Sequence, residues 1–291
     1  MKVRNVLFFL AVLFLVVFAV SALAGDLQEI KQRGVLRHLG IPYANFVSGS
    51  GDGMDVDLMQ RFAASIGVKY EYVMTDWGTV VEDLIGKKVE VKGTEVLFRD
   101  EVPVKRDLIA NGFTILPWRE KVVTFSNNTF PSQVWLLARA DSKIAPIKPS
   151  KDIQQDITNT KALMKGVSVL TLEKTCLDPA LYKLAETGAN IVAMTGNLNE
   201  MAPALLNKVG ELTILDVPDA LVALEKWPGK FKIIGQVSDK QFMAVGFPKE
   251  SNQLREAFNT FLDKSRKDGS YMKIVKKYYP SVPRYFPEFF K

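Results

Sequence analysis

The feature that most constrains the fold of this chain is a regular alternation of short apolar runs with amphipathic stretches. Residues 56–66 carry apolar side chains at helical spacing and end at Gly67, and residues 68–74 then alternate as a strand does. The second half repeats this order, with an apolar run at 212–216 followed by an amphipathic stretch at 218–227. Strands separated by helices at this interval favour an α/β fold with mainly parallel sheets.

The same periodicities locate the other elements. Asp178 followed by Pro179 is typical of a helix start, with Asp178 as the cap. The spacing of Asn197 and Glu200 predicts a capping box. Strands are predicted at 35–40, 68–74, 108–116, 133–138, 167–172, 191–194, 212–216, 231–234 and 242–247. Helices are predicted at 27–33, 56–66, 80–85, 178–188, 218–227, 252–267 and 271–278.

Cys176 is the only cysteine of the chain. No internal disulfide can form, so stability must come from a hydrophobic core. The composition agrees, because 47% of the residues are hydrophobic and 24% are charged. The formal charge of +6 is spread among acidic residues, whereas nucleic-acid binding requires a basic stripe with stacking aromatics. We expect no nucleic-acid partner, and no motif predicts a metal or a cofactor.

The N-terminus has the three parts of a secretory signal peptide. Lys2 and Arg4 precede an apolar run at 6–20, and small residues at Ala22 and Ala24 follow it. The run is shorter than the ~20 residues that span a bilayer. We therefore expect residues 1–24 to be cleaved after Ala24, leaving an exported, soluble protein.

Four segments of the remaining chain resemble the family 3 extracellular solute-binding proteins, the polar-amino-acid receptors of ABC importers. They are 53–58 (Gly-Met-Asp-Val-Asp-Leu), 107–126 with its pattern Gly-x-Thr-x-x-x-x-Arg, 215–218 (Leu-Asp-Val-Pro), and the ending from 246 to 279. The resemblance implies a two-lobed α/β fold, the type II periplasmic binding fold. In this fold each lobe is a mainly parallel sheet flanked by helices, and two crossover strands join the lobes.

On this resemblance, lobe 1 is expected to comprise residues 25–138 and 241–291, and lobe 2 residues 139–240. The crossovers are expected near 138–142 and 235–240. The chain departs from the family in several places, and two of these are whole segments. About 20 residues lie between Gly86 and Asp107 where the family needs only a few, and their pattern predicts a hairpin at 88–106. The tail at 280–290 is unusually aromatic.

The resemblance also assigns a ligand site. A free amino acid carries a carboxylate and an ammonium, and the planar fork of arginine matches the two carboxylate oxygens. By position, Arg119 is expected to bind the α-carboxylate with help from Thr114, and Asp216 the α-ammonium from the opposite lobe. Gly112 is expected to let the backbone approach the ligand, and Asn111 to offer its carbonyl oxygen.

Aromatic walls and one loop complete the expected site. Tyr43 and Trp77 stand where the family places the rings that sandwich the ligand. The loop at 171–178 precedes a predicted helix whose N–H groups suit a carboxylate, and Thr175 is the candidate there. Ile41 stands where many amino-acid receptors carry an acid, which removes one expected ammonium partner.

These features predict a periplasmic receptor, monomeric and without cofactor or metal, that closes on a zwitterionic ligand and delivers it to an ABC permease. We expect no enzymatic activity. One alternative is a dehydratase-like periplasmic enzyme on the same fold, with Glu173 or Asp216 recruited for catalysis. The other is a non-transport accessory or signalling protein. His38, the only histidine, lies in a strand-like run and is interpreted as structural.

Overall fold

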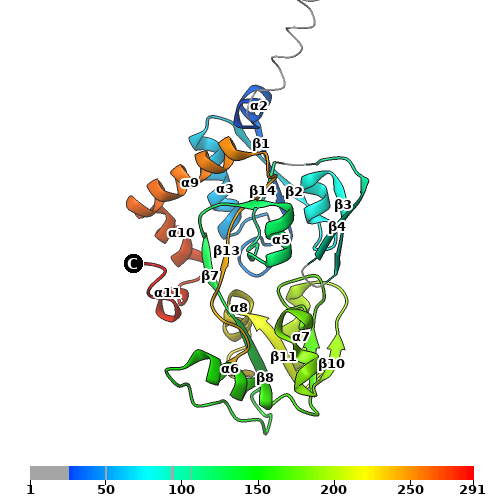
Figure 1. Ribbon diagram of the computed structural model, residues 1–291. Helices are drawn as coiled ribbons and strands as arrows, with labels where there is room; N and C mark the ends of the chain where they lie inside the picture. The colour runs from blue at the N-terminus through cyan, green and yellow to red at the C-terminus, as the bar shows by residue number, and fades with distance from the viewer. Residues whose placement is uncertain (1–25, 50, 93–94, 106) are drawn as a thin grey trace, which may run out of the picture.

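The computed structural model describes residues 26–49, 51–92, 95–105 and 107–291. They form two α/β lobes stacked along the long axis of the molecule (Figure 1). The predicted signal peptide and its cleavage after Ala24 lie outside these residues. Within the described part of the chain, no helix is both long and apolar enough to cross a membrane.

Lobe 1 is built on a five-stranded sheet in the order β2-β1-β5-β14-β6. Strand β1 pairs in parallel with β2 on one side and with β5, the central strand, on the other, while β14 runs antiparallel between β5 and β6. The carboxyl ends of β1, β2 and β5 therefore meet at one edge. The strands are β1 (Val35–Gly40), β2 (Lys69–Met74), β5 (Leu108–Ile109), β6 (Thr124–Phe125) and β14 (Gly246–Phe247).

Helices cover this sheet, and the last two long ones return from the C-terminal part of the chain. In α9 the side chains of Leu254, Phe258 and Leu262 are buried at four-residue spacing, so one face of the helix joins the core. The Phe258 ring lies edge-on to Phe62 of α3, with 5.2 Å between centroids. The helices are α2 (Asp26–Arg33), α3 (Met54–Ser65), α4 (Val80–Ile85), α5 (Pro117–Val122), α9 (Asn252–Lys267), α10 (Ser270–Tyr278) and α11 (Val282–Tyr285).

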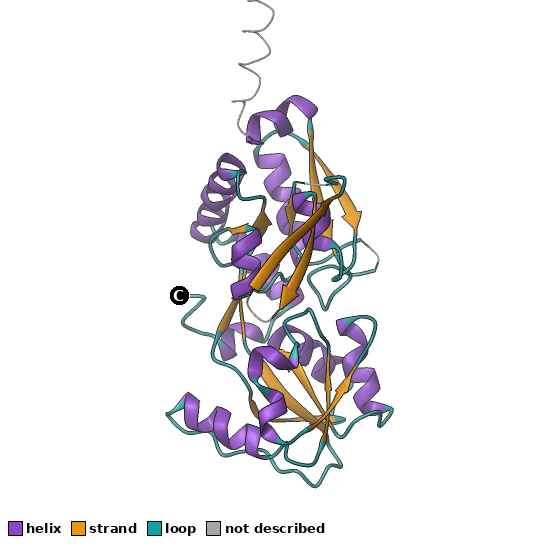
Figure 2. Ribbon diagram, turned by 45° about the vertical axis from the view of Figure 1, so that its right-hand side comes forward, coloured by secondary structure: helices purple, strands orange, loops and turns teal. Residues whose placement is uncertain are grey.

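Lobe 2 has a second five-stranded sheet in the order β10-β9-β11-β8-β12. Strands β9, β10 and β11 are parallel, and β8 is antiparallel to β11 and β12 (Figure 2). The strands are β8 (Val134–Arg139), β9 (Ser168–Thr171), β10 (Asn190–Ala193), β11 (Leu212–Asp216) and β12 (Phe231–Gln236). The α-helices are α6 (Ile153–Ala162), α7 (Met201–Leu206) and α8 (Val217–Lys226), and the 3-10 helices are η2 (Pro179–Tyr182), η3 (Leu184–Thr187) and η4 (Leu198–Glu200).

The lobes are joined by a pair of antiparallel strands, β7 (Phe130–Ser132) and β13 (Gln241–Met243). The predicted boundary at residue 138, with lobe 2 as 139–240 and a first crossover at 138–142, is therefore wrong. Strand β8 hydrogen-bonds to β11 and β12 along its length, so it belongs to lobe 2. We define lobe 1 as residues 26–129 and 244–291, and lobe 2 as residues 133–240.

Two predicted strands are shorter in the structure. The strand predicted at 108–116 ends at Ile109 because the chain turns at Gly112, whose φ is 64°. The strand predicted at 242–247 is divided between β13 and β14, which pair with different sheets.

Two local predictions in lobe 2 also need correction. The helix predicted at 178–188 is a pair of 3-10 helices, because Lys183 between them adopts a φ of 53°. Asp178 caps the first of them, as predicted, by accepting from the Ala180 N–H. The capping box does not form, since Asn197 precedes η4 without a side-chain cap.

The predicted insertion is a hairpin of β3 (Lys87–Lys92) and β4 (Glu95–Glu101). Val91 pairs with Val96 across it, and the tip at 93–94 lies outside the described residues. Val89 and Val96 pack against a small apolar cluster of lobe 1 that includes Val80 and Leu84. The hairpin is therefore attached to lobe 1 by only a few side chains.

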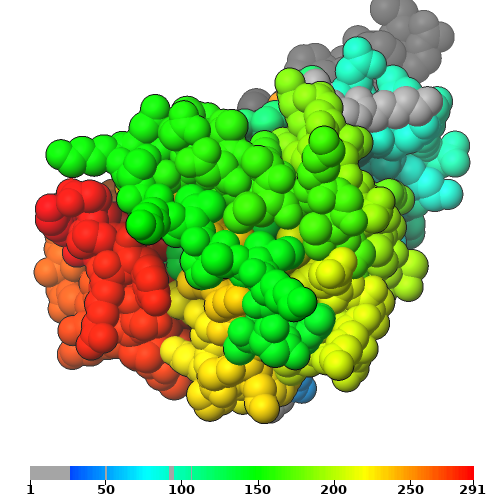
Figure 3. All heavy atoms as spheres, turned by 90° about the horizontal axis from the view of Figure 1, so that it is seen from below, coloured from blue at the N-terminus to red at the C-terminus, as the bar shows by residue number. Residues whose placement is uncertain are grey.

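The aromatic tail crosses from lobe 1 to lobe 2. Tyr279 packs against Phe46 and Phe130, and Phe289 stacks on Phe242 of β13. The Tyr285 ring then lies edge-on to Trp135 of β8, with 5.6 Å between centroids. Figure 3 shows these C-terminal residues, in red, against the green and yellow surface of lobe 2.

Candidate functional site

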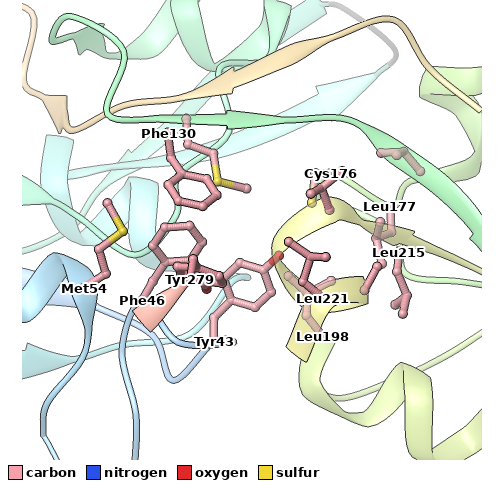
Figure 4. Close-up of a cluster of buried hydrophobic side chains, with 14 of the residues drawn as sticks. Tyr43, Phe46, Met54, Phe130, Cys176, Leu177, Leu198, Leu215, Leu221 and Tyr279 are labelled. Atoms are coloured by element: carbon pink, nitrogen blue, oxygen red, sulfur yellow. The ribbon is translucent and has the colours of Figure 1, made fainter. Parts of the chain in front are cut away.

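The carboxyl ends of parallel strands in both lobes bring the candidate residues together. In lobe 1, Tyr43 follows β1, Trp77 follows β2 and Asn111 follows β5. In lobe 2, β9 ends at Thr171 and β11 at Asp216. Ligands of open α/β sheets bind at this edge, and the close-up of the interface shows Tyr43 pointing from lobe 1 toward Cys176 and Leu221 of lobe 2 (Figure 4).

Arg119 lies at the centre of this interface and is almost completely buried, with 2% of its surface exposed. It is held by α5, which begins at Pro117, a residue that suits the first turn of a helix. Its Nη1 donates to the Thr114 carbonyl oxygen at 2.9 Å. The guanidinium carbon lies 4.2 Å from the ring centroid of Phe113 and 5.6 Å from that of Trp77.

The charge of Arg119 is not balanced by a carboxylate in the part of the chain that the structure describes. Burial lowers the pKa of Arg119 to about 10, and the ionisable groups that oppose this change are Cys176 and Tyr182. Burial raises the pKa of both the thiol and the phenol, so both are neutral at pH 7. No carboxylate among the described residues forms an ion pair with Arg119.

Several other buried polar atoms at this edge have no hydrogen-bond partner within the described part of the chain. They are Arg119 Nε, Trp77 Nε1, both amide atoms of Asn111, and the Thr171 hydroxyl. Asn111 is fully buried. Most buried polar groups in proteins are hydrogen-bonded, and each that is not costs about 1–3 kcal/mol. Most of these atoms are donors, so together they suit an anionic group.

Asp216, unlike these atoms, has hydrogen-bond partners within the protein. It is the N-cap of α8, and its Oδ1 accepts from the Tyr43 hydroxyl across the interface and from the Asp219 N–H at 3.4 Å. Its Oδ2 lies 3.4 Å from the Cys176 Sγ. Burial raises the pKa of Asp216 to about 6, and these hydrogen bonds oppose the rise. Both of its oxygens are therefore engaged by the protein.

Cys176 was not among the residues expected at the site. It is buried, and its carbonyl oxygen accepts from the Tyr182 hydroxyl, which in turn accepts from Gln241 Nε2 at 3.2 Å. Burial raises the pKa of its thiol, and the Arg119 guanidinium and the Thr114 side chain of lobe 1 oppose that rise. The only sequence signal for this role was the position of Cys176 next to the candidate Thr175.

Gly112 has a clear role in the fold. Its φ of 64° and a Cβ that would lie 2.4 Å from the Phe46 ring require glycine. Its N–H donates to Oδ2 of Asp55 at 2.7 Å. The N–H is therefore not available to a ligand, and Gly112 instead fixes the turn that carries Asn111.

The predicted carboxylate cradle around Thr175 is occupied by the chain itself. The Thr175 hydroxyl donates to the Leu172 carbonyl oxygen at 2.7 Å and accepts from the Leu177 N–H at 3.0 Å. Asp178 takes the N–H groups of Ala180 and Lys174. The donor hydrogen of Thr175 is used within its own loop, and Cys176 faces Asp216 in its place.

A second contact between the lobes lies beside Tyr43. The Asn199 side chain of η4 accepts from the Ala44 N–H at 2.9 Å and donates to the Pro42 carbonyl oxygen at 3.3 Å. Ala44 adopts a φ of 45°, a region that non-glycine residues rarely occupy. The neighbouring Ile41 is part of the core.

His38 is buried beneath the site. Its Nδ1 lies 2.8 Å from the Tyr70 hydroxyl, and its Nε2 contacts the Ala110 carbonyl oxygen. Burial lowers the pKa of His38 to about 4, so the ring is neutral at pH 7 and supports the chain next to Asn111. Within the described residues, no group of three or more His, Cys, Asp or Glu side chains is placed to hold a metal ion.

Comparison with known proteins gives a consistent result. Residues 103–281, more than half of the chain, match the family described as bacterial extracellular solute-binding proteins, family 3. The histidine-binding periplasmic protein of Escherichia coli (strain K12) is 26% identical over 247 residues, covering 81% of this chain and 84% of that protein. The lysine/arginine/ornithine-binding periplasmic protein of the same organism is 27% identical over 252 residues, with the same coverage.

Among solved structures, a mutant of ArgBP from T. maritima superposes with a TM-score of 0.68. It is 24% identical in sequence, and the match covers 88% of this chain and 99% of that one. The type II periplasmic binding fold expected from the sequence is thereby confirmed.

Proposed function

Because this chain belongs to the family 3 bacterial extracellular solute-binding proteins, we propose that it is a periplasmic receptor that closes on a small solute bearing a carboxylate, an amino acid or a related compound, and delivers it to an ABC permease. The periplasmic location of its relatives and their amino-acid ligands support this proposal.

The observation that carries the proposal is Arg119, a buried cation that forms no ion pair within residues 26–49, 51–92, 95–105 and 107–291. Taking an unpaired charge out of water costs several kcal/mol, and a bound carboxylate would remove most of that cost. The guanidinium fork binds both oxygens of a carboxylate at once. Trp77 Nε1 and the Asn111 amide supply further donors at the same edge.

The contacts between the lobes support closure around the ligand. Tyr43 and Ala44 of lobe 1 are hydrogen-bonded to Asp216 and Asn199 of lobe 2. A ligand shifts the equilibrium between open and closed forms only through contacts that differ between them. A carboxylate held by Arg119 next to Cys176 would gain such contacts in the closed form.

The assignment of individual ligand residues is part of the proposal. Arg119, Trp77, Asn111 and Thr171 form its carboxylate end, and Tyr43 is a wall of the site. The enzymatic alternative loses one of its two acids, because Glu173 is exposed. The other, Asp216, is already bonded to Tyr43 and Cys176.

The test is a thermal-shift screen against amino acids and small carboxylic acids, followed by calorimetry on Arg119→Lys. The substitution keeps the charge but loses the fork, so we expect at least about tenfold weaker binding. Arg37→Lys, at a half-exposed arginine of lobe 1 near Glu71, is the matched control. Unchanged affinity in Arg119→Lys would remove Arg119 from the site.

A further inference from the structure

The two ends of the candidate site differ in whether their polar groups already have hydrogen-bond partners. The oxygens of Asp216 already accept from Tyr43, Cys176 and the Asp219 N–H. The donors around Arg119 have no partner among the described residues. An incoming ligand would therefore meet donors without a partner at the anion-binding end of the site. The acceptors at the expected ammonium-binding end are already hydrogen-bonded.

We propose that the ligand is a carboxylate without an α-amino group, either a 2-hydroxy acid or its unsubstituted analogue. This inference rests on the proposed function, because it concerns the same interlobe site and the same Arg119.

An ammonium would have to compete for Asp216. It carries three donors and a full charge, and it is satisfied only by charged or several strong acceptors. Reaching Asp216 would displace either the Cys176 thiol or the Tyr43 hydroxyl, and loss of the Tyr43 contact would break a hydrogen bond between the lobes. Burial and Asp216 raise the pKa of the adjacent carboxyl of Asp219 well above its usual value, so it is a weaker partner for an ammonium than a freely ionised carboxylate.

A 2-hydroxyl group makes no such demand. It donates one hydrogen and accepts others, so neutral groups satisfy it. The unpartnered oxygen of Asn111 is an acceptor of this kind, and the Thr171 hydroxyl can act as donor or acceptor. A hydroxy acid can therefore bind while Tyr43 stays on Asp216 and the lobes stay in contact.

Tyr43 and Cys176 occupy the two oxygens of Asp216, and each can be changed separately. Tyr43 is fully buried and stacks on Phe46 with 5.9 Å between ring centroids. Tyr43→Phe keeps this ring packing and removes only the hydroxyl that occupies Asp216. Cys176→Ala removes the donor on the other oxygen. Both variants leave Arg119, Trp77 and Asn111 in place.

The experiment uses three matched series in isothermal calorimetry: alanine, lactate and propionate; leucine, 2-hydroxyisocaproate and isocaproate; phenylalanine, phenyllactate and phenylpropionate. In the unmodified protein we expect the best-binding hydroxy acid to bind at least about tenfold more tightly than its amino acid. In Tyr43→Phe this ratio should fall at least about tenfold through improved binding of the amine. Cys176→Ala should move the ratio in the same direction.

The outcomes separate this inference from the function on which it rests. Tighter binding of an amino acid than of its hydroxy analogue by the unmodified protein overturns the inference and leaves the receptor function standing. A ratio that Tyr43→Phe leaves unchanged also overturns it. The proposed function itself fails if no compound of any series binds and Arg119→Lys does not weaken the binding of any ligand found in the thermal-shift screen. A single cooperative thermal transition in both variants shows that the fold is intact.

Discussion

The two lobes differ in how many hydrogen bonds they provide to a buried aspartate. Each lobe places a buried aspartate at the start of a helix, Asp55 in the first turn of α3 and Asp216 as the cap of α8. Asp216 has hydrogen-bond partners on both oxygens, whereas Oδ1 of Asp55 has none among the described residues. Burial raises the pKa of Asp55 to about 7 and that of Asp216 to about 6.

The difference shows that hydrogen bonds, more than burial, distinguish these two carboxyl groups. Desolvation dominates at both, but Tyr43, Cys176 and the Asp219 N–H all stabilise ionised Asp216, while only the Gly112 N–H stabilises ionised Asp55. Asp216 of lobe 2 is thus satisfied by the protein, whereas Arg119 Nε, Trp77 Nε1 and the Asn111 amide of lobe 1 have no partner among the described residues.

The largest effect that tests this comparison is on the pH dependence of stability. Both carboxyl groups bind their proton more tightly in the native state than at the ordinary value of 3.8. Their contribution to the free energy of unfolding is therefore complete below about pH 4 and is lost as the pH rises through 7 for Asp55 and 6 for Asp216. One pKa unit corresponds to about 1.4 kcal/mol. Between pH 4 and 8 the free energy of unfolding of Asp55→Asn should therefore fall less than that of the unmodified protein, by on the order of 4 kcal/mol.

Asp216→Asn is the matched variant in lobe 2. Here the difference from the unmodified protein in the pH-dependent fall of the free energy of unfolding should be smaller, on the order of 3 kcal/mol, and should be reached by about pH 7. Urea unfolding of the three proteins across pH 4 to 8 measures both. A larger effect of Asp216→Asn than of Asp55→Asn would contradict the comparison.

The second prediction concerns the unpaired cation. Arg119→Met removes a buried charge but keeps an apolar side chain among Phe113, Trp77 and Trp118. The free energy of unfolding of the ligand-free protein should therefore rise by about 2 kcal/mol. Arg37→Met, beside Glu71 at 3.9 Å, should change it by less than about 1 kcal/mol. A destabilised Arg119→Met protein would show that Arg119 is balanced by the protein itself.

The third prediction asks how much of lobe 1 depends on its insertion. Deleting residues 88–106 and rejoining the flanks should leave a cooperatively unfolding protein. The cost should be about 1–2 kcal/mol, from the partial burial of Val89 and Val96. Denaturant melts of the shortened chain measure it, and loss of a single cooperative transition would place the hairpin in the core of lobe 1.

The smallest effect tests whether the tail holds the lobes together. Tyr285→Ala removes the edge contact with Trp135 and should reduce the free energy of unfolding by about 1 kcal/mol. Tyr285→Phe keeps the ring and is the control. Equal losses in the two variants would mean that the hydroxyl, and not the aromatic contact with lobe 2, is responsible.

Most of the fold could be predicted from the sequence, because its signals are local. Glycine stops and apolar spacing place α4 and α9 at their observed limits, and valines on either side of a polar tip predict the hairpin. The lobe boundary could not be predicted, because the apolar pattern of β8 does not reveal which sheet it joins. That choice depends on pairing with β11 and β12, which lie far along the chain.

The candidate site could be predicted only in part. Resemblance brings Tyr43, Trp77, Asn111, Arg119 and Asp216 to one interface, as the structure does. It gives no information on how these residues bond to one another, so the Tyr43 contact with Asp216 and the role of Cys176 were missed. Thr175 fits a ligand role by position, yet its hydroxyl serves its own loop.

The placement of β14 has a consequence for the order in which the chain can assemble. Residues 246–247 lie between β5 and β6 in the lobe 1 sheet, and α9 and α10 pack on α2 and α3. All five strands of the lobe 2 sheet, in contrast, lie between residues 134 and 236. During synthesis from the N-terminus, lobe 2 can therefore complete its sheet first, while the apolar edge of β5 waits for a strand made later. The part of the protein that is synthesised first is the part that matures last, and it is the part that a chaperone would need to protect.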